Sequence, residues 1–238
     1  MPSRTLLFLL LLACLALGGC QRVFFAALNV GPTPVAGPSV SYGPAPEHRL
    51  DLYPAQGVAA EERAPVVLFL YGGRWQGGRR ADYAFVGERL AQAGVLVLVA
   101  DYRQHPQVGF PVFVEDAALA LRWSIAQAAQ YGGDPRRVFV VGHSAGAHIR
   151  ALLATDARYL AAVDLSPRDI AGFVGLAGPY DFLPLTDRDL QTIFGPPEQW
   201  SQSQPVNFVD GDEPPMLLLH GADDALVWPR NSQSLARA

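Results

Sequence analysis

Residues 138–146 read Val-Phe-Val-Val-Gly-His-Ser-Ala-Gly, and this stretch decides the fold. Its apolar first half predicts a strand buried on both faces, and residues 147–154 directly after it have helical character. The pentapeptide at the junction matches the pattern G-x-S-x-G, whose glycines permit a sharp strand-to-helix turn. Such a turn projects the Ser144 hydroxyl above the sheet, and the N–H of Ala145 then faces an oxyanion formed when Ser144 attacks a carbonyl. Ser144 is the predicted nucleophile.

Strands and helices alternate on both sides of this junction. Further strands are predicted at 66–71, 95–100, 170–177 and 215–220, and helices at 82–93 and 112–130. Two short strands joined by a turn, 40–42 and 50–53, are expected at an edge of the sheet. Residues 178–209 are rich in proline and polar residues, so we expect mostly loop that covers the active site. The pattern predicts an α/β fold in one domain, with a mostly parallel central sheet and helices on both faces.

Two glycines end the strand predicted at 66–71. Tyr71-Gly72-Gly73-Arg74-Trp75 resembles the HGG-x-W oxyanion loop of esterases, with Tyr71 in place of the histidine. By position, the N–H groups of Gly73 and Arg74 would join that of Ala145 as oxyanion-hole donors. The Tyr71 hydroxyl is expected to brace the loop. Trp75 either walls the substrate pocket or belongs to the core.

The strand at 215–220 leads into a turn that carries two acidic residues. His220-Gly221-Ala222-Asp223-Asp224, with Val227 beyond it, resembles the HG-x-x-D-x-x-V segment that presents the acid of a catalytic triad. By that spacing Asp224 is the acid, which accepts a hydrogen bond from the catalytic imidazole and fixes its tautomer. Asp223 is the main rival for this role. His220 is expected to brace the turn.

The order of these motifs is more specific than any one of them. Together with residues 77–83, 101–103, 110–111 and Asp116, they resemble the carboxylesterase and kynurenine-formamidase-like (BD-FAE-like) branch of the α/β-hydrolases, from about residue 40 onward. The resemblance implies a serine hydrolase that cleaves carboxylic esters of small acyl groups through an acyl-enzyme on Ser144, with no metal or organic cofactor. An aryl-formamidase-type amide hydrolase and a non-catalytic envelope lipoprotein remain alternatives. Asp101 and Asp116 are expected to be structural, pairing with arginines or capping helices.

The triad expected from this resemblance lacks its histidine. The family order is Ser, Asp, His, and no histidine follows Asp224. His143 is expected to point away from the nucleophile, His148 lies inside the following helix, and His105 is the conceivable relocated base. We therefore expect a C-terminally truncated chain that lacks the last strand and helix, exposes an apolar sheet edge and is nearly inactive by itself. A truncated gene model would explain the pattern equally well.

The N-terminal residues predict export and anchoring. Arg4 precedes an apolar run, 6–17, that is too short to span a bilayer, so residues 1–19 are expected to be a lipoprotein signal peptide. The run ends in a sequence that resembles the bacterial lipobox, which implies a lipidated Cys20 that anchors the chain to the membrane. The expected location is the periplasm-facing cell envelope, and Gln21 favours the outer membrane. An ordinary secretory signal is the alternative.

The remaining composition sets the domain limits and excludes one class of partner. Residues 20–38 contain glycine and proline without periodicity, so we expect a tether with no regular structure, followed by a hydrolase domain at 39–238, incomplete at its C-terminus. Half of the residues are hydrophobic, which is sufficient for a sizeable core. The net charge is -4, so no basic surface is expected to bind nucleic acid.

Overall fold

The computed structural model describes residues 25–30, 39–59 and 62–238. The predicted signal peptide, the predicted lipidation site Cys20 and residues 31–38 of the predicted tether lie outside the described residues. No helix in the described ranges combines the length and the apolar character needed to cross a membrane.

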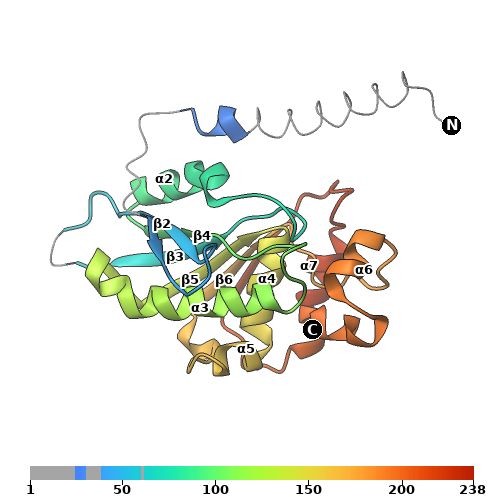
Figure 1. The fold of residues 1–238 in the computed structure, drawn as a ribbon. Helices are drawn as coiled ribbons and strands as arrows, with labels where there is room; N and C mark the ends of the chain where they lie inside the picture. Colours follow the sequence, from blue (N-terminus) through green and yellow to red (C-terminus); the bar gives the residue numbers. More distant parts are fainter. Residues whose placement is uncertain (1–24, 31–38, 60–61) are drawn as a thin grey trace, which may run out of the picture.

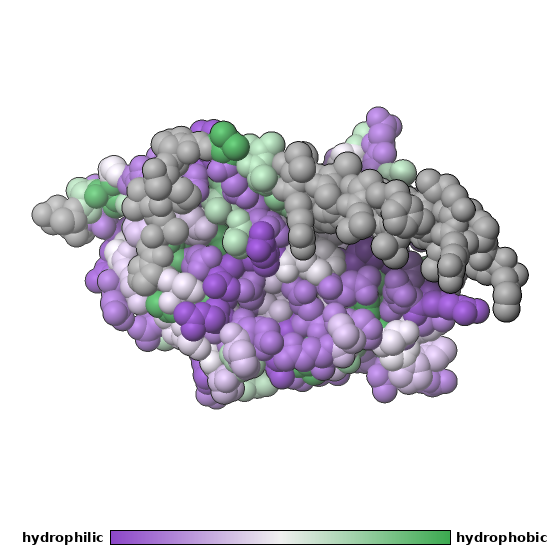
Figure 2. All heavy atoms as spheres, turned by 45° about the horizontal axis from the view of Figure 1, so that its top comes forward, coloured by the Kyte–Doolittle hydropathy of each residue, from purple (hydrophilic) through white to green (hydrophobic). Residues whose placement is uncertain are grey.

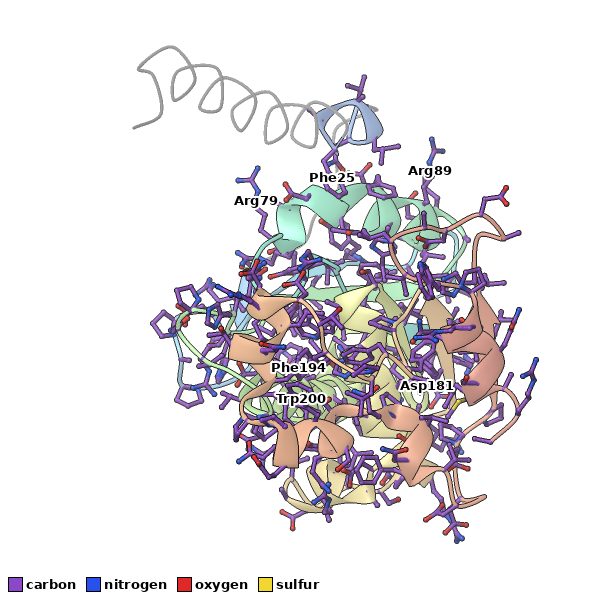
Figure 3. All side chains as sticks on the ribbon, turned by 90° about the vertical axis from the view of Figure 1, so that its right-hand side faces the viewer. Phe25, Arg79, Arg89, Asp181, Phe194 and Trp200 are labelled. Atoms are coloured by element: carbon purple, nitrogen blue, oxygen red, sulfur yellow. The ribbon has the colours of Figure 1, made fainter. Side chains whose placement is uncertain are left out.

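One expectation about the tether is wrong. Residues 25–28 form a helical turn, where no regular structure was expected. The turn is held by contacts with a distant segment, because the ring of Phe25 packs on Tyr83 with centroids 5.1 Å apart. The Asn29 side chain donates to the carbonyl of Asp82 and accepts from the N–H of Phe85. Figure 3 shows Phe25 directed from this turn toward the main body of the protein.

Seven strands form one sheet in the order β1-β2-β4-β3-β5-β6-β7. Their bounds are β1 Ser39–Ser41, β2 Arg49–Tyr53, β3 Ala64–Leu70, β4 Leu96–Ala100, β5 Gly133–His143, β6 Gly172–Leu176 and β7 Met216–Leu219. The β1–β2 and β2–β4 pairs are antiparallel and the other pairs are parallel, so the predicted mostly parallel sheet is confirmed. The edge position expected for 50–53 is wrong, because β2 lies between β1 and β4 and buries Leu50 and Leu52.

Helices cover both faces of the sheet, as the alternation predicted (Figure 1). After the turn at 25–28, the helical segments are η1 Arg80–Tyr83, α2 Ala84–Gln92, α3 Val112–Gln127, η2 Ala128–Tyr131, α4 Ala145–Thr155, α5 Ala157–Ala161, η3 Pro167–Asp169, α6 Arg188–Phe194, η4 Pro197–Ser203, η5 Pro205–Phe208 and α7 Arg230–Leu235. Figure 1 shows α2 on one face and α3 and α5 on the other. Every residue of α4 is buried, because α4 packs against β5, β6 and α3. The helix that begins at the predicted nucleophile is therefore fixed from several sides.

Residues 178–209, named here the cap segment, are more regular than expected. The expectation of mostly loop is wrong for α6, η4 and η5, which lie within this segment. The proline and polar residues of this segment interrupt the hydrophobic pattern by which a helix is predicted. Ile193 and Phe194 at the end of α6 are nevertheless buried and pack it against the core. Figure 3 shows Phe194 and Trp200 within this part of the chain.

The far edge of the sheet exposes apolar side chains. In the part of the chain that the structure describes, β7 pairs only with β6, and its Leu217 and Leu219 are about half exposed. The open apolar edge expected from the sequence is therefore present, and truncation itself stays a prediction. The face turned forward in Figure 2, on the α2 side, is by contrast mostly hydrophilic outside the grey residues.

Candidate active site

The predicted nucleophile lies at the junction of β5 and α4. Ser144 has φ 53° and ψ -119°, a conformation that residues with a Cβ rarely adopt. Its N–H donates to the carbonyl of Leu176 on β6 at 2.8 Å. The turn needs the glycine at 146, because a Cβ there would lie 2.2 Å from the carbonyl oxygen of Leu70. The strand–turn–helix context predicted for the G-x-S-x-G pattern is confirmed.

The glycine loop, residues 72–78, follows β3 and lies against this junction. A Cβ added to Gly72 would be 2.9 Å from the Cβ of Ser144. Gly73 has φ 147°, and a Cβ there would lie 2.0 Å from the carbonyl oxygen of Gly77. Arg74 and Trp75 have positive φ values of 54° and 59°. The loop is tightly folded, and its first residues lie next to Ser144.

Side chains outside the glycine loop hold it in place. The Gln104 amide donates to the Tyr71 hydroxyl at 2.9 Å and to the carbonyl of Gly78 at 3.2 Å. The expectation that Tyr71 braces the loop is confirmed, with Gln104 as the link. The Arg74 guanidinium donates to the Asp187 carboxylate in the cap segment at 2.7 Å, and both side chains are partly exposed.

A cavity of about 310 Å³ opens beside Ser144. Mostly apolar and aromatic side chains line it: Arg74, Trp75, Ser144, Pro179, Phe182, Pro184, Thr186, Leu190, Leu226, Val227, Trp228, Arg230 and Asn231. Trp75 fits both of its expected roles, since it lines this cavity and is only 4% exposed. Five of these thirteen lining residues belong to the cap segment. Among the described residues, no group of three His, Cys, Asp or Glu side chains could hold a metal ion.

Asp224 closes the turn after β7. One carboxylate oxygen accepts from the N–H groups of Leu226 and Val227, both at 2.9 Å, and the other lies 3.6 Å from Nε2 of His220. The hydrogen bond from the Val227 N–H is the largest cause that lowers the pKa of Asp224, which favours the ionised form. Asp223 is exposed on the same turn. The geometry favours Asp224 as the acid, and its role stays a prediction.

The histidine side chains have partners other than the Ser144 hydroxyl. Nε2 of His220 donates to the carbonyl of Val227 at 2.6 Å and Nδ1 lies 2.7 Å from the Ser232 hydroxyl, so the expected bracing role of His220 is confirmed. Nδ1 of His143 is 2.9 Å from the Tyr83 hydroxyl. Burial lowers the pKa of His143, while the charge of Asp224 opposes this shift. No histidine in the described ranges is hydrogen-bonded to the Ser144 hydroxyl.

Three further histidines are fixed by different groups. Nε2 of His48 is 2.9 Å from the buried Asp116 carboxylate, and His148 is enclosed in the core. His105 contacts the glycine loop through its backbone, where its N–H donates to the carbonyl of Trp75 at 2.9 Å. The His105 side chain does not line the cavity beside Ser144. Its role as a relocated base stays a prediction without a supporting contact.

The structural roles expected for two aspartates are confirmed. Asp101 forms an ion pair with Arg80 and accepts the Arg80 N–H. Asp116 accepts from the backbone and the guanidinium of Arg103. Both arrangements fix loops at the carboxyl end of the sheet and leave these carboxylates occupied.

The sequence did not indicate the roles of two polar residues that hold the segments around the cavity. The buried Asn231 on α7 accepts from the N–H groups of Tyr180 and Asp181, at 2.9 and 2.8 Å, and thereby holds the start of the cap segment. His148 hydrogen-bonds both the glycine loop and the cap segment. No local pattern marks either residue, since each bonds partners 50 or more positions away.

The mostly parallel sheet and the strained serine between β5 and α4 define an α/β-hydrolase. The chain belongs to the BD-FAE family, whose model matches residues 50–238.

Curated proteins with related sequences carry esterase names. The chain is 32% identical to the probable isoprenylcysteine alpha-carbonyl methylesterase ICMEL1 of Arabidopsis thaliana, over 83% of this chain and 46% of that protein. It is also 32% identical to the esterase LipC of Mycobacterium tuberculosis, over 82% of this chain and 53% of that protein. The chain thus spans about half the length of these relatives.

Solved esterase structures share the fold. The apo form of Thermogutta terrifontis esterase 2 superposes with a TM-score of 0.72 and 24% sequence identity, covering 87% of this chain and 79% of that one. A truncated form of a carbohydrate esterase from gut microbiota superposes with a TM-score of 0.74, also at 24% identity, covering 87% of this chain and 85% of that one.

Proposed function

We propose that the protein is a serine hydrolase that cleaves carboxylic esters of small acyl groups, with Ser144 as its nucleophile. The observation that carries this proposal is the position of Ser144, which is held at φ 53° between β5 and α4 and lines a cavity of about 310 Å³. The esterase names of the related sequences support the same reaction class.

The reaction would proceed through an acyl-enzyme. The Ser144 oxygen attacks the ester carbonyl, the alcohol leaves with a proton, and water then hydrolyses the acyl-serine. Ala145 is the first residue of α4, so its N–H has no partner within the helix and is available to the oxyanion. The N–H groups of Gly73 and Arg74 are proposed as the other donors, because the glycine loop lies against Ser144.

Asp224 is proposed to orient the imidazole that serves as general base. None of the described histidines is hydrogen-bonded to the Ser144 hydroxyl, so the expectation of a base beyond residue 238 stays a prediction. The near-inactivity expected for the 238-residue chain also stays a prediction.

The cavity supports short acyl groups as substrates. Its volume of about 310 Å³ lies at the lower end of the usual range for small-molecule sites, roughly 300–1,000 Å³. The apolar side chains of Phe182 and Leu190 line it, which favours a hydrocarbon acyl chain over a charged one. Trp228, which is 57% exposed, lies among the lining residues and would contact a larger alcohol portion.

Kinetics on matched substrates test this proposal. The product of the complete gene and the 238-residue chain would be assayed on p-nitrophenyl esters from acetate to octanoate, each beside its Ser144→Ala variant. We expect the complete product to prefer short esters and Ser144→Ala to lower turnover by about a thousandfold or more. An N-formyl aryl amine hydrolysed faster than any ester would favour the aryl-formamidase alternative. A complete product without ester or amide turnover would overturn the proposal and favour a non-catalytic binding protein.

We also propose that the protein is a lipoprotein of the bacterial cell envelope, anchored through Cys20 and facing the periplasm, in the outer membrane rather than the inner one. The support is the resemblance of residues 17–20 to a lipobox and the glutamine at position 21. Metabolic labelling with an alkyne fatty acid should mark the wild type and not Cys20→Ser, and membrane fractionation should locate the labelled protein. If the wild type and Cys20→Ser were both unlabelled and both absent from the membrane fraction, this placement would be overturned.

A further inference from the structure

We propose that His148 is a positioning residue that couples the glycine loop to the cap segment, so that the oxyanion donors are in place while the cap segment is docked. This inference rests on the proposed function of the site. It assigns His148 no contact with substrate.

His148 lies on α4, four residues after Ser144, and its side chain is fully buried. The indole N–H of Trp75, in the glycine loop, donates to Nδ1 of His148 at 3.1 Å. Nε2 of His148 is 2.7 Å from the carbonyl oxygen of Ser203, in the cap segment. A carbonyl can only accept, so Nε2 carries the proton and Nδ1 accepts. One tautomer of the neutral imidazole therefore joins the two segments, and an imidazolium cannot do so.

Aromatic rings enclose this imidazole and exclude water. Phe182 and Phe194 from the cap segment and Trp75 from the glycine loop all meet the His148 ring nearly at right angles, with centroids between 5.1 and 5.6 Å away. Trp75 also contacts Phe194 directly, at 4.8 Å. Burial lowers the pKa of His148 to about 4, which keeps the ring neutral near pH 7. In such surroundings a lost partner would leave a buried polar group unsatisfied.

The glycine loop needs this external support. Arg74 and Trp75 both have positive φ, and such backbone persists only where surrounding contacts over-determine it. Arg74 in the glycine loop also forms an ion pair with Asp187 in the cap segment, and each of these two side chains is more than 40% exposed. Exposed ion pairs contribute little in water. The buried link through His148 is therefore the stronger coupling.

Three variants separate coupling from general stability. His148→Phe keeps an aromatic ring and removes both hydrogen bonds, while His148→Gln offers a carbonyl oxygen to Trp75 and an amide N–H to Ser203. Asp187→Asn weakens the exposed link and keeps a side-chain oxygen that can accept from the N–H of Asp189 at the start of α6, so it is the matched control. Hydrogen exchange would be measured in residues 72–78, in residues 198–208, and in α2 as an internal reference.

We expect His148→Phe to speed exchange in both the glycine loop and the cap segment by about tenfold or more, with α2 unchanged. His148→Gln should restore most of the protection, and Asp187→Asn should change neither region. In the complete gene product, His148→Phe should lower kcat on a short ester by about tenfold or more while KM changes little, because oxyanion donors act in the transition state.

Faster exchange in only one of the two regions, or an unchanged kcat in His148→Phe, would overturn the coupling. Should that variant fail to fold, ¹⁵N NMR of the wild type decides, since we expect the Nε2–H tautomer and a slowly exchanging Trp75 indole proton between pH 6 and 8. The opposite tautomer would overturn the proposal. A complete gene product without ester or amide turnover would overturn the proposed function, while the exchange and tautomer results would still test the coupling.

Discussion

Replacing Ser144 by glycine should make the protein more stable while abolishing its proposed activity. Ser144 has φ 53° and ψ -119°, where the Cβ of any L-residue is crowded. Glycine adopts this conformation without that strain. Ser144→Ala is the matched control, because alanine loses the same hydroxyl and keeps the crowded Cβ.

The size of the effect follows from two opposing contributions to the free energy of unfolding. A non-glycine residue in such a conformation costs about 1–3 kcal/mol. Glycine gives the unfolded chain more freedom, which costs about 0.4–1 kcal/mol. The difference between these contributions is about 0–2.6 kcal/mol, so Ser144→Gly should be more stable than Ser144→Ala by about 1 kcal/mol.

Urea unfolding followed by tryptophan fluorescence measures this difference. With a slope of about 2 kcal/mol per molar urea, the midpoint of Ser144→Gly should lie about 0.5 M above that of Ser144→Ala. Both variants should have the same slope, which shows that the unfolded states are comparable. A Ser144→Gly midpoint at or below that of Ser144→Ala would refute the assignment of strain to this turn.

Three further changes test the fold and its charges. Gly146→Ala places a Cβ 2.2 Å from the carbonyl oxygen of Leu70, so urea unfolding should show that the free energy of unfolding falls by about 3 kcal/mol or more. An unchanged unfolding midpoint would contradict the close packing of this turn. Arg150 is fully buried, and its Nε and one terminal nitrogen have no hydrogen-bond partner among the described residues. Burial also lowers its pKa to about 9. Arg150→Met should therefore leave the free energy of unfolding unchanged or raise it by about 1–3 kcal/mol, and a large decrease would contradict this explanation. Burial lowers the pKa of His148 to about 4 in the folded protein, whereas its pKa in the unfolded chain is about 6.5. Between these two pH values the unfolded state binds more protons than the folded state, so the free energy of unfolding should fall by about 3 kcal/mol as the pH drops from 6.5 to 4. His148→Gln should flatten this slope, and an equally steep slope would show that other groups cause it.

The elements predicted correctly are those whose pattern is local. The strands β3, β4 and β5 are buried on both faces, so continuous apolar runs revealed them, and the glycines at 142 and 146 marked the turn between β5 and α4. The helix α6 was missed because its apolar residues are few and its burial depends on Trp75, far away in sequence. The six-residue α7 was missed for a similar reason, since Asn231 holds it to residues about 50 positions earlier.

The candidate site likewise contains parts that the sequence predicted and a part that it did not. Ser144, the glycine loop and the Asp224 turn could be found because each is one short motif at the end of a strand. The connection through His148 could not, since it joins residues 73 and 55 positions apart. Its geometry depends on how the cap segment folds over α4, which no short motif encodes.

Mass spectrometry after treatment with a fluorophosphonate tests the central claim, that Ser144 is the nucleophile, most directly. The reagent forms a stable bond with an activated serine, so the product of the complete gene should carry one adduct on the peptide that contains Ser144. The same treatment of Ser144→Ala should give none. An adduct on another serine, or ester turnover that survives in Ser144→Ala, would contradict the assignment.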